Sequence, residues 1–203
     1  MSNLISLNEK IFLAGSNGMA GKAISRSLKK KSYGDIKKGG LLLTPSSNEL
    51  NLLSTDLVKK YFEIHKPSIV IMAAAKVGGI QANASMPGDF ILENLKIQNN
   101  IIESAWEFGV KRLLFLGSSC IYPKFAQQPI KEEFLMQGPL ESTNEYYAIA
   151  KIAGIKLCQS LRKQYNFDAI SLMPTNLFGP GDNYDLNNGH VMAALLRKFI
   201  EAK

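Results

Sequence analysis

Tyr147 and Lys151 lie four residues apart in the segment Tyr-Tyr-Ala-Ile-Ala-Lys, and this spacing places both side chains on one face of a helix. A free tyrosine has a pKa of about 10 and is a poor acid or base near neutrality. A cation beside the phenol favours the phenolate, so we expect Lys151 to lower the pKa of Tyr147. Tyr147 could then exchange a proton with a carbonyl or an alcohol. Such pairs also occur by chance in many helices, so the interpretation depends on two elements upstream.

The first of these elements is a glycine-rich turn between a predicted strand and a predicted helix. Its glycines have the spacing GxxGxxG, which differs from the GxGxxG of ordinary dehydrogenases. Glycines permit a tight bend and let the backbone approach a pyrophosphate at the helix N-terminus. Glycines after a strand also form ordinary turns, but the strand–turn–helix setting favours a cofactor. The predicted cofactor-binding residues of the turn are Gly15, Ser16, Asn17, Gly18, Met19, Ala20 and Gly21.

The second element is a pair of serines, Ser118 and Ser119, at the end of the predicted strand 112–116. The carboxyl ends of parallel strands face the ligand crevice, and a hydroxyl there can bind a substrate carbonyl. The alternative is a polar strand end that bonds to nearby backbone. Cys120 follows, where a thiol could act as an acid or base, although packing is the usual role of cysteine. We interpret Cys158 as packing.

Two further segments carry possible site residues. His190 begins the last predicted helix, where imidazole could serve as a general acid or base, or could simply be an exposed cap residue. The small residues of 73–79 follow a predicted strand and would let a cofactor ring lie close, although tight packing of a helix on the sheet would favour them equally.

Apolar runs that suit strands alternate with helical patterns along the chain, which is typical of βαβ units on a parallel sheet. We therefore predict an α/β fold with a doubly wound parallel sheet of Rossmann type. A Pro- and polar-containing excursion at 120–144 is long enough to suggest function. The predicted strands are 11–14, 41–43, 68–74, 112–116 and 169–173, and the predicted helices are 19–31, 56–65, 87–108, 146–165 and 191–202.

Composition limits the classes of protein that fit. A chain of 203 residues with 46% hydrophobic content can bury the core of one large domain. It has no run of 18 apolar residues, and its N-terminus does not read as a signal peptide. Two cysteines are too few for a disulfide framework or a zinc cluster. We expect a cytoplasmic protein with no metal site and no membrane contact.

The net charge of +7 raises the question of nucleic-acid binding. The lysines are densest at 29–31 and at 37–38, without interleaved aromatic residues or a nucleic-acid-binding motif. Such lysines usually form a solvated face, and a basic surface also suits an anionic nucleotide. We expect no nucleic-acid partner.

Longer strings extend these motifs: AAAKVGG at 73–79, LGSSCIYPK at 116–124, TNEYYAIAKIAGIK at 143–156 and MPTNLFG at 173–179. Together they closely resemble the GDP-L-fucose synthase family of the extended short-chain dehydrogenase/reductase superfamily, from about residue 11 to 199. This family acts on GDP-4-keto-6-deoxy-D-mannose as a 3,5-epimerase and 4-reductase. The 4,6-dehydratases of the superfamily have Thr-Asp-Glu where this chain has Ser-Ser-Cys, which argues against a dehydratase.

The resemblance implies a role for each matching residue. Tyr147 would donate a proton at C4, Lys151 would lower its pKa and hold the nicotinamide ribose, and Ser118 would orient the keto oxygen. Cys120 and His190 would be the acid–base pair that inverts C3 and C5. The implied cofactor-binding set adds to the glycine turn Leu116, Gly117, Ser118, Ser119, Lys151, Pro174, Thr175, Asn176, Leu177 and His190, and the implied substrate-binding residue is Lys198.

Two departures from the family pattern affect these expectations. Members that prefer NADP carry arginines in the glycine turn and after the second strand, whereas this chain has Ser16-Asn17 and the segment TPSSN at 44–48. Lys37 and Lys38, or the polar groups of 46–48, would then have to bind the 2′-phosphate. The family also continues into a C-terminal substrate domain, and this chain ends at Lys203.

We expect an NADP-dependent GDP-L-fucose synthase, with NAD as the alternative cofactor, a GDP-sugar as substrate and a homodimer as the assembly. Residues 1–180 would form the NAD(P)-binding domain, and 181–203 would begin a truncated substrate-binding region with little turnover of its own. The alternatives are a related NAD-dependent sugar-nucleotide epimerase and a non-catalytic NAD(P)-binding module.

Overall fold

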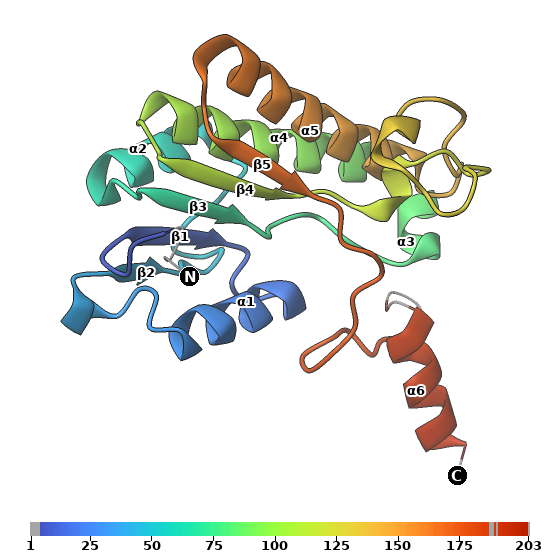
Figure 1. The fold of residues 1–203 in the computed structure, drawn as a ribbon. Helices are drawn as coiled ribbons and strands as arrows, with labels where there is room; N and C mark the ends of the chain where they lie inside the picture. The colour runs from blue at the N-terminus through green and yellow to red at the C-terminus, as the bar shows by residue number, and fades with distance from the viewer. Residues whose placement is uncertain (1–4, 187–188, 190, 203) are drawn as a thin grey trace.

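The computed structural model describes residues 5–186, 189 and 191–202, which form one parallel five-stranded sheet and its helices (Figure 1). The strand order is β2-β1-β3-β4-β5, and all four neighbouring pairs are parallel. The strands are β1 (Lys10–Ala14), β2 (Leu41–Leu43), β3 (Ile69–Met72), β4 (Arg112–Leu116) and β5 (Ala169–Leu172). The α-helices are α1 (Met19–Lys30), α2 (Thr55–His65), α3 (Ile80–Ser85), α4 (Pro87–Glu107), α5 (Glu145–Tyr165) and α6 (Val191–Glu201).

The direction of each crossover decides which face of the sheet a helix covers. The chain moves from β1 outward to β2 through α1, and then returns past β1 to β3, β4 and β5 through α2, α4 and α5. Because parallel crossovers are right-handed, opposite directions of travel place helices on opposite faces. Figure 1 shows this arrangement, with α1 on one face and α2, α4 and α5 on the other. The expected doubly wound Rossmann-type fold is confirmed.

The core lies between the sheet and the three-helix layer. Alternate residues of β4 point to this layer, and Leu113 and Phe115 are fully buried there. A smaller cluster on the α1 face joins Ile11 and Leu13 to Ile24 and Leu28 of α1. Further along that face Leu172 is half exposed, because α1 does not extend over β5.

Most predicted elements agree with the structure to within two residues, and β2 and β4 have the predicted bounds. The Ser54 hydroxyl accepts a hydrogen bond from the Leu57 N–H at 3.4 Å and caps the N-terminus of α2. The short helix α3 was not predicted. The excursion 120–144 contains two short 3-10 helices, η2 (Ser119–Ile121) and η3 (Glu132–Phe134), and another, η1 (Ile36–Lys38), precedes β2. Within the described part of the chain, no helix is long and apolar enough to cross a membrane.

Candidate active site

The chain reverses its direction of travel across the sheet between β1 and β3, and their carboxyl ends therefore form the switch point where ligands bind in such sheets. The glycine turn follows β1 at this point. Gly15 has a φ of +82°, and a Cβ on it would lie 2.6 Å from the Ala74 backbone nitrogen. The turn and the small residues of 73–79 therefore pack backbone against backbone, and the two segments form one floor.

The N-terminus of α1 opens onto this floor. Gly18 is the N-cap, no side chain caps it, and the first turn of the helix has no acidic residue. The first N–H groups of a helix have no partner within the helix and attract anions. A Cβ on Gly21 would collide with the Gly15 carbonyl oxygen and lie 2.8 Å from the Ser16 Cα, so the turn can curl this tightly only around glycine. The arrangement fits a dinucleotide pyrophosphate.

The catalytic candidates meet at the carboxyl end of β4. The Lys151 ammonium donates a hydrogen bond to the Leu116 carbonyl at 2.8 Å and lies 5.7 Å from the Tyr147 ring centroid. The Cys120 thiol donates to the Ser118 hydroxyl at 3.0 Å. The Tyr147 ring packs edge-on against Phe90 at a centroid distance of 6.5 Å. A tyrosine, a buried cation, a hydroxyl and a thiol are thus brought together from one loop and one helix.

Burial controls the proton affinities in this cluster. Burial raises the pKa of Tyr147 well above its usual value, the Cys120 charge raises it further, and hydrogen bonding to Ser118 acts in the opposite direction. Burial also lowers the pKa of Lys151 to about 8, although the Cys120 charge opposes that shift. The pKa of Tyr147 is thus shifted upward in this structure, opposite to the direction expected from its spacing to Lys151, and desolvation is the largest cause.

Burial likewise raises the pKa of the Cys120 thiol, while the Ser118 hydrogen bond and the Lys151 charge both act to lower it. The thiol is therefore protonated at neutral pH and needs a nearby positive charge to act as a base. Cys158 is buried on α5, and burial raises its pKa to about 11, which confirms the interpretation as packing.

The loops after β4 and β5 run together and bring in the remaining predicted cofactor residues. The Gly117 N–H donates to the Leu172 carbonyl at 2.7 Å, and the Ser119 N–H donates to the Pro174 carbonyl at 3.2 Å. Residues 174–177 therefore begin beside Ser119, and Thr175, Asn176 and Leu177 are exposed.

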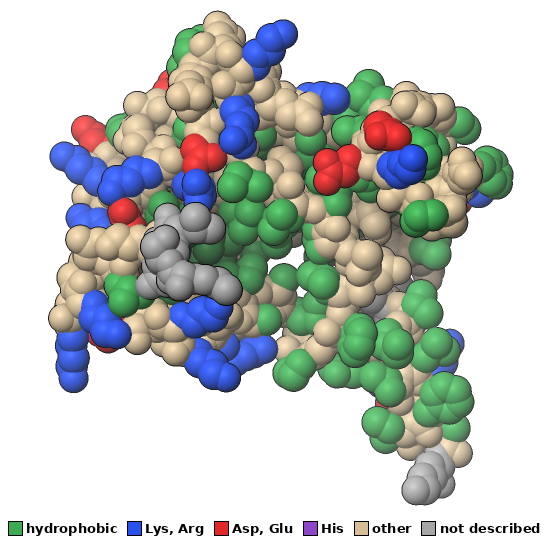
Figure 2. All heavy atoms as spheres, in the orientation of Figure 1, with side chains coloured by type: hydrophobic (Ala, Val, Ile, Leu, Met, Phe, Trp, Pro, Cys, Tyr) green, Lys and Arg blue, Asp and Glu red, His purple; other side chains and the backbone are tan. Residues whose placement is uncertain are grey.

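Two predicted residues are not part of this cluster. His190 lies outside the described residues. Lys198 is exposed on α6, which extends away from the sheet and carries the exposed apolar residues Leu195, Phe199 and Ile200 (Figures 1 and 2). Arg197 of α6 donates a hydrogen bond to the Tyr184 carbonyl at 3.3 Å, which attaches the helix to the segment before it.

The structure adds a residue that we did not predict from the sequence. Asn94 of α4 is 2% exposed; its side chain accepts from the Lys76 N–H and donates to the Lys76 carbonyl, both at 3.0 Å. It therefore holds in place the loop after β3, which forms part of the floor. Asn94 and Gln98 lie four residues apart on the buried side of α4. Two polar residues on an otherwise apolar helix face could have indicated from the sequence that their side chains hold another segment.

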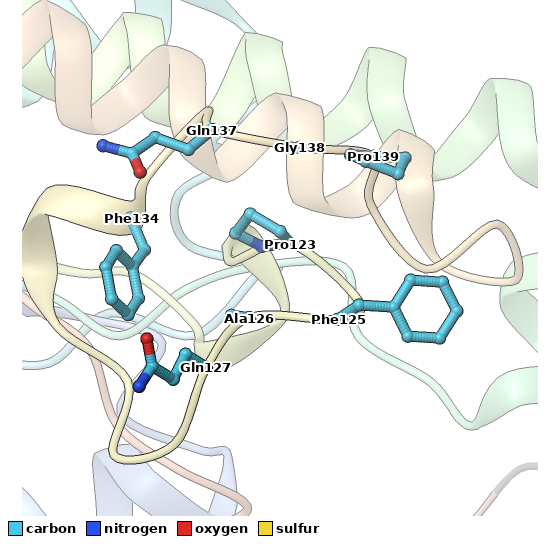
Figure 3. A pocket seen from close by; sticks show the side chains of 8 residues that line it. All are labelled: Pro123, Phe125, Ala126, Gln127, Phe134, Gln137, Gly138 and Pro139. Carbon is cyan, nitrogen blue, oxygen red and sulfur yellow. The ribbon is translucent and has the colours of Figure 1, made fainter.

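A separate hollow of about 310 Å³ lies within the excursion 120–144 (Figure 3). None of its lining residues is a predicted site residue, and none is ionisable, so we assign the chemistry to the β4 cluster instead. The lining residues are Pro123, Phe125, Ala126, Gln127, Phe134, Gln137, Gly138 and Pro139. Among the described residues, no group of three or more His, Cys, Asp or Glu could hold a metal ion.

Comparison with known proteins agrees with this geometry. GDP-L-fucose synthase 1 of Arabidopsis thaliana is 54% identical over 203 residues, which are 100% of this chain and 61% of that protein. GDP-L-fucose synthase of Escherichia coli K12 is 53% identical over 194 residues, covering 96% of this chain and 59% of the relative. The chain thus spans about 60% of the length of these relatives.

Among solved structures, the GDP-mannoheptose C4 reductase MlghC of Campylobacter jejuni, with NADP bound, superposes with a TM-score of 0.88 at 39% identity. The match covers 98% of this chain and 59% of that one. The family model described as "NAD dependent epimerase/dehydratase family" matches residues 11–203. With its glycine turn at the switch point and the Tyr147–Lys151 pair beside the end of β4, the chain belongs to the NAD-dependent epimerase/dehydratase family.

Proposed function

We propose that this chain is the cofactor-binding part of a GDP-L-fucose synthase, which epimerises GDP-4-keto-6-deoxy-D-mannose at C3 and C5 and reduces it at C4. The observation that carries the proposal is the contact between Cys120 and Ser118, close to Tyr147 and Lys151. A reductase needs only the hydroxyl and the tyrosine. A thiol in the same cluster adds a group that can remove a proton from carbon. The names of the relatives at 53–54% identity support the same activity.

The chemistry of the ketone connects the two reactions. A carbonyl at C4 acidifies the hydrogens on C3 and C5, so one ketone serves both inversions before reduction removes it. In this proposal Cys120 exchanges protons at these carbons, and the Ser118 hydroxyl orients the C4 oxygen. His190 would act as the partner acid.

Reduction then requires a proton at the C4 oxygen, and in this proposal Tyr147 would donate it. Burial raises the pKa of Tyr147, so the phenol holds its proton at neutral pH and would release it only as negative charge develops on the C4 oxygen. Lys151, held by the Leu116 carbonyl, would bind the nicotinamide ribose and stabilise the phenolate that forms. A bound nicotinamide dinucleotide would supply the hydride. NADPH is the donor chosen for the assay below, because the Campylobacter jejuni reductase holds NADP.

The same proposal extends to the domain organisation and the assembly of the protein. Residues 1–180 would bind the cofactor, and 181–203 would begin the substrate-binding region, with Lys198 reaching the GDP-sugar. We further propose a cytoplasmic homodimer with no nucleic-acid partner. Light scattering at several protein concentrations would test the dimer.

Deuterium uptake from heavy water into the sugar, measured beside NADPH oxidation, separates the two reactions. The assay uses the 203-residue chain and the same chain fused to the remaining region of the Escherichia coli relative. Cys120→Ser should abolish uptake at C3 and C5, because a hydroxyl is far less acidic than a thiol. Tyr147→Phe should keep uptake but lose NADPH oxidation.

Cys158→Ser is the matched control and should change neither signal, because this thiol is buried away from the cluster. Normal uptake in Cys120→Ser would refute the assignment of the thiol. No uptake and no oxidation in either form of the wild-type protein would refute the proposed function.

A further inference from the structure

The loop after β2, residues 44–50, lies beside the glycine turn because β2 is the hydrogen-bonded neighbour of β1. The Ser16 hydroxyl donates to the Thr44 carbonyl at 3.4 Å and links the two segments. In dinucleotide-binding sheets an acidic residue near this position accepts a hydrogen bond from the ribose 2′-hydroxyl, whereas an arginine accommodates a 2′-phosphate. The charge of this loop therefore bears on the choice between NAD and NADP.

This loop carries a carboxylate and no cation. Glu49 and Asp56 are the charged residues of 41–58, and the glycine turn 15–21 has none. One Glu49 carboxylate oxygen accepts from the Ser46 N–H at 2.7 Å and from the Ser46 hydroxyl at 2.8 Å. These hydrogen bonds lower the pKa of Glu49, so it is ionised at neutral pH. The donors of Ser46 that a phosphate could use are thus already bound to an anion.

The lysines suggested by the sequence lie at the wrong edge of the sheet. Lys37 and Lys38 form η1, which comes before β2, and a Cβ on the nearby Gly40 would meet the Leu7 carbonyl. Leu7 precedes β1, so η1 lies at the amino edge, whereas the cofactor floor is at the carboxyl edge. The five residues of β1 separate these edges by roughly 15 Å, which a lysine side chain cannot bridge.

Lys22, which directly follows the glycine turn, lies against the segment after β5 and not against the loop after β2. The Lys22 ammonium lies 4.0 Å from the place that a Cβ on Gly181 would occupy, in the segment after β5. Its side chain therefore lies against that segment.

We infer that the neutral loop Ser46–Asn48, backed by Glu49, makes this site indifferent or unfavourable to a 2′-phosphate, so that NADH binds at least as tightly as NADPH. The inference rests on the proposed cofactor site and deepens it. It replaces the expectation that Lys37 and Lys38, or the polar groups of 46–48, hold a 2′-phosphate.

Fluorescence titration of the 203-residue chain with NADH and NADPH gives both dissociation constants directly, without turnover. The expected result is a Kd for NADH equal to or below that for NADPH. Ser47 is exposed, so Ser47→Arg should be tolerated. It should tighten NADPH by about tenfold or more while leaving NADH nearly unchanged, because a guanidinium adds a charge-assisted contact that only the phosphate can use.

Lys38→Ala is the matched control at the amino edge and should leave both constants unchanged. NADPH binding tenfold tighter than NADH in the wild type would overturn the inference, as would a loss of NADPH affinity alone in Lys38→Ala or Lys22→Gln. An unchanged Kd for NADPH in Ser47→Arg would also overturn it, because the loop would then not face the 2′ position. Failure to bind either nucleotide would overturn both the cofactor site and the inference. If NADH binds at least as tightly as NADPH but the sugar undergoes no reaction, only the proposed function would be refuted.

Discussion

Gly21→Ala should disrupt the cofactor floor, because the added methyl has no space. Its Cβ would collide with the Gly15 carbonyl oxygen and lie 2.7 Å from the Gly15 carbonyl carbon and 2.8 Å from the Ser16 Cα. All three atoms are backbone, so no side chain can rotate away. The start of α1 must shift relative to the turn, which moves the N–H groups that would face a pyrophosphate.

Overpacking typically costs 1–3 kcal/mol, and clashes with backbone lie at the upper end, so we expect a loss of about 3 kcal/mol. For a domain of this size that loss corresponds to a fall in Tm of about 6–12 °C. Cofactor affinity should fall by about tenfold or more, because contacts made by the turn backbone depend on its position.

Thermal unfolding and fluorescence titration with NADH measure the two effects. Gly88→Ala is the matched control: it lies in the first turn of α4 with nothing within 4 Å of its added methyl. It should leave NADH binding unchanged and raise stability by about 0.5–1 kcal/mol. If Gly21→Ala changed Tm by less than 2 °C and kept its NADH affinity, the close approach of turn and helix would not hold in solution, and the reasoning would be refuted.

Burial lowers the pKa of Lys151 to about 8, whereas in the unfolded chain its pKa is about 10.4, so the unfolded state binds more protons between these pH values. In urea titrations from pH 7.5 to 10, the stability of the wild type should therefore rise by about 2–3 kcal/mol relative to that of Lys151→Met. A difference that stays constant with pH would mean that the lysine is solvated. Asn94→Leu should cost about 2–4 kcal/mol in thermal unfolding, because it leaves the Lys76 N–H and carbonyl without their partner; a loss below 1 kcal/mol would argue against the anchor. Ser54→Ala should cost about 0.5–1 kcal/mol in urea unfolding and leave NADH affinity unchanged, and a change in affinity would contradict a purely capping role.

The predictions that succeeded from sequence rest on local patterns. The apolar runs of β2 and β4 follow from short-range preferences, and the structure confirms their predicted bounds. The helix α3 was missed because it follows two glycines and lasts only six residues, too few to show an apolar period.

In the candidate site, too, the features that depend on nearby residues could be predicted and the long-range contacts could not. The spacing of Tyr147 and Lys151 and the order of strand, glycine turn and helix could be read from the chain, because each depends on residues close in sequence. The convergence of Ser118, Cys120 and Lys151 at the end of β4 depends on how α5 packs on the sheet. The anchoring of Lys76 by Asn94 likewise needs two segments that are 18 residues apart.

The sequence alone therefore determined which chemical groups this protein carries and which elements present them. The tertiary structure decided where charges lie and how they ionise. The parallel pairing of β2 with β1 placed Lys37 and Lys38 at the amino edge, away from the cofactor floor. Burial raised the pKa of Tyr147, against the expectation from its spacing to Lys151, and it lowered the pKa of Lys151. Spacing along a helix fixes which side chains are neighbours, but the free energy of a charge depends on the water that the whole fold removes from it.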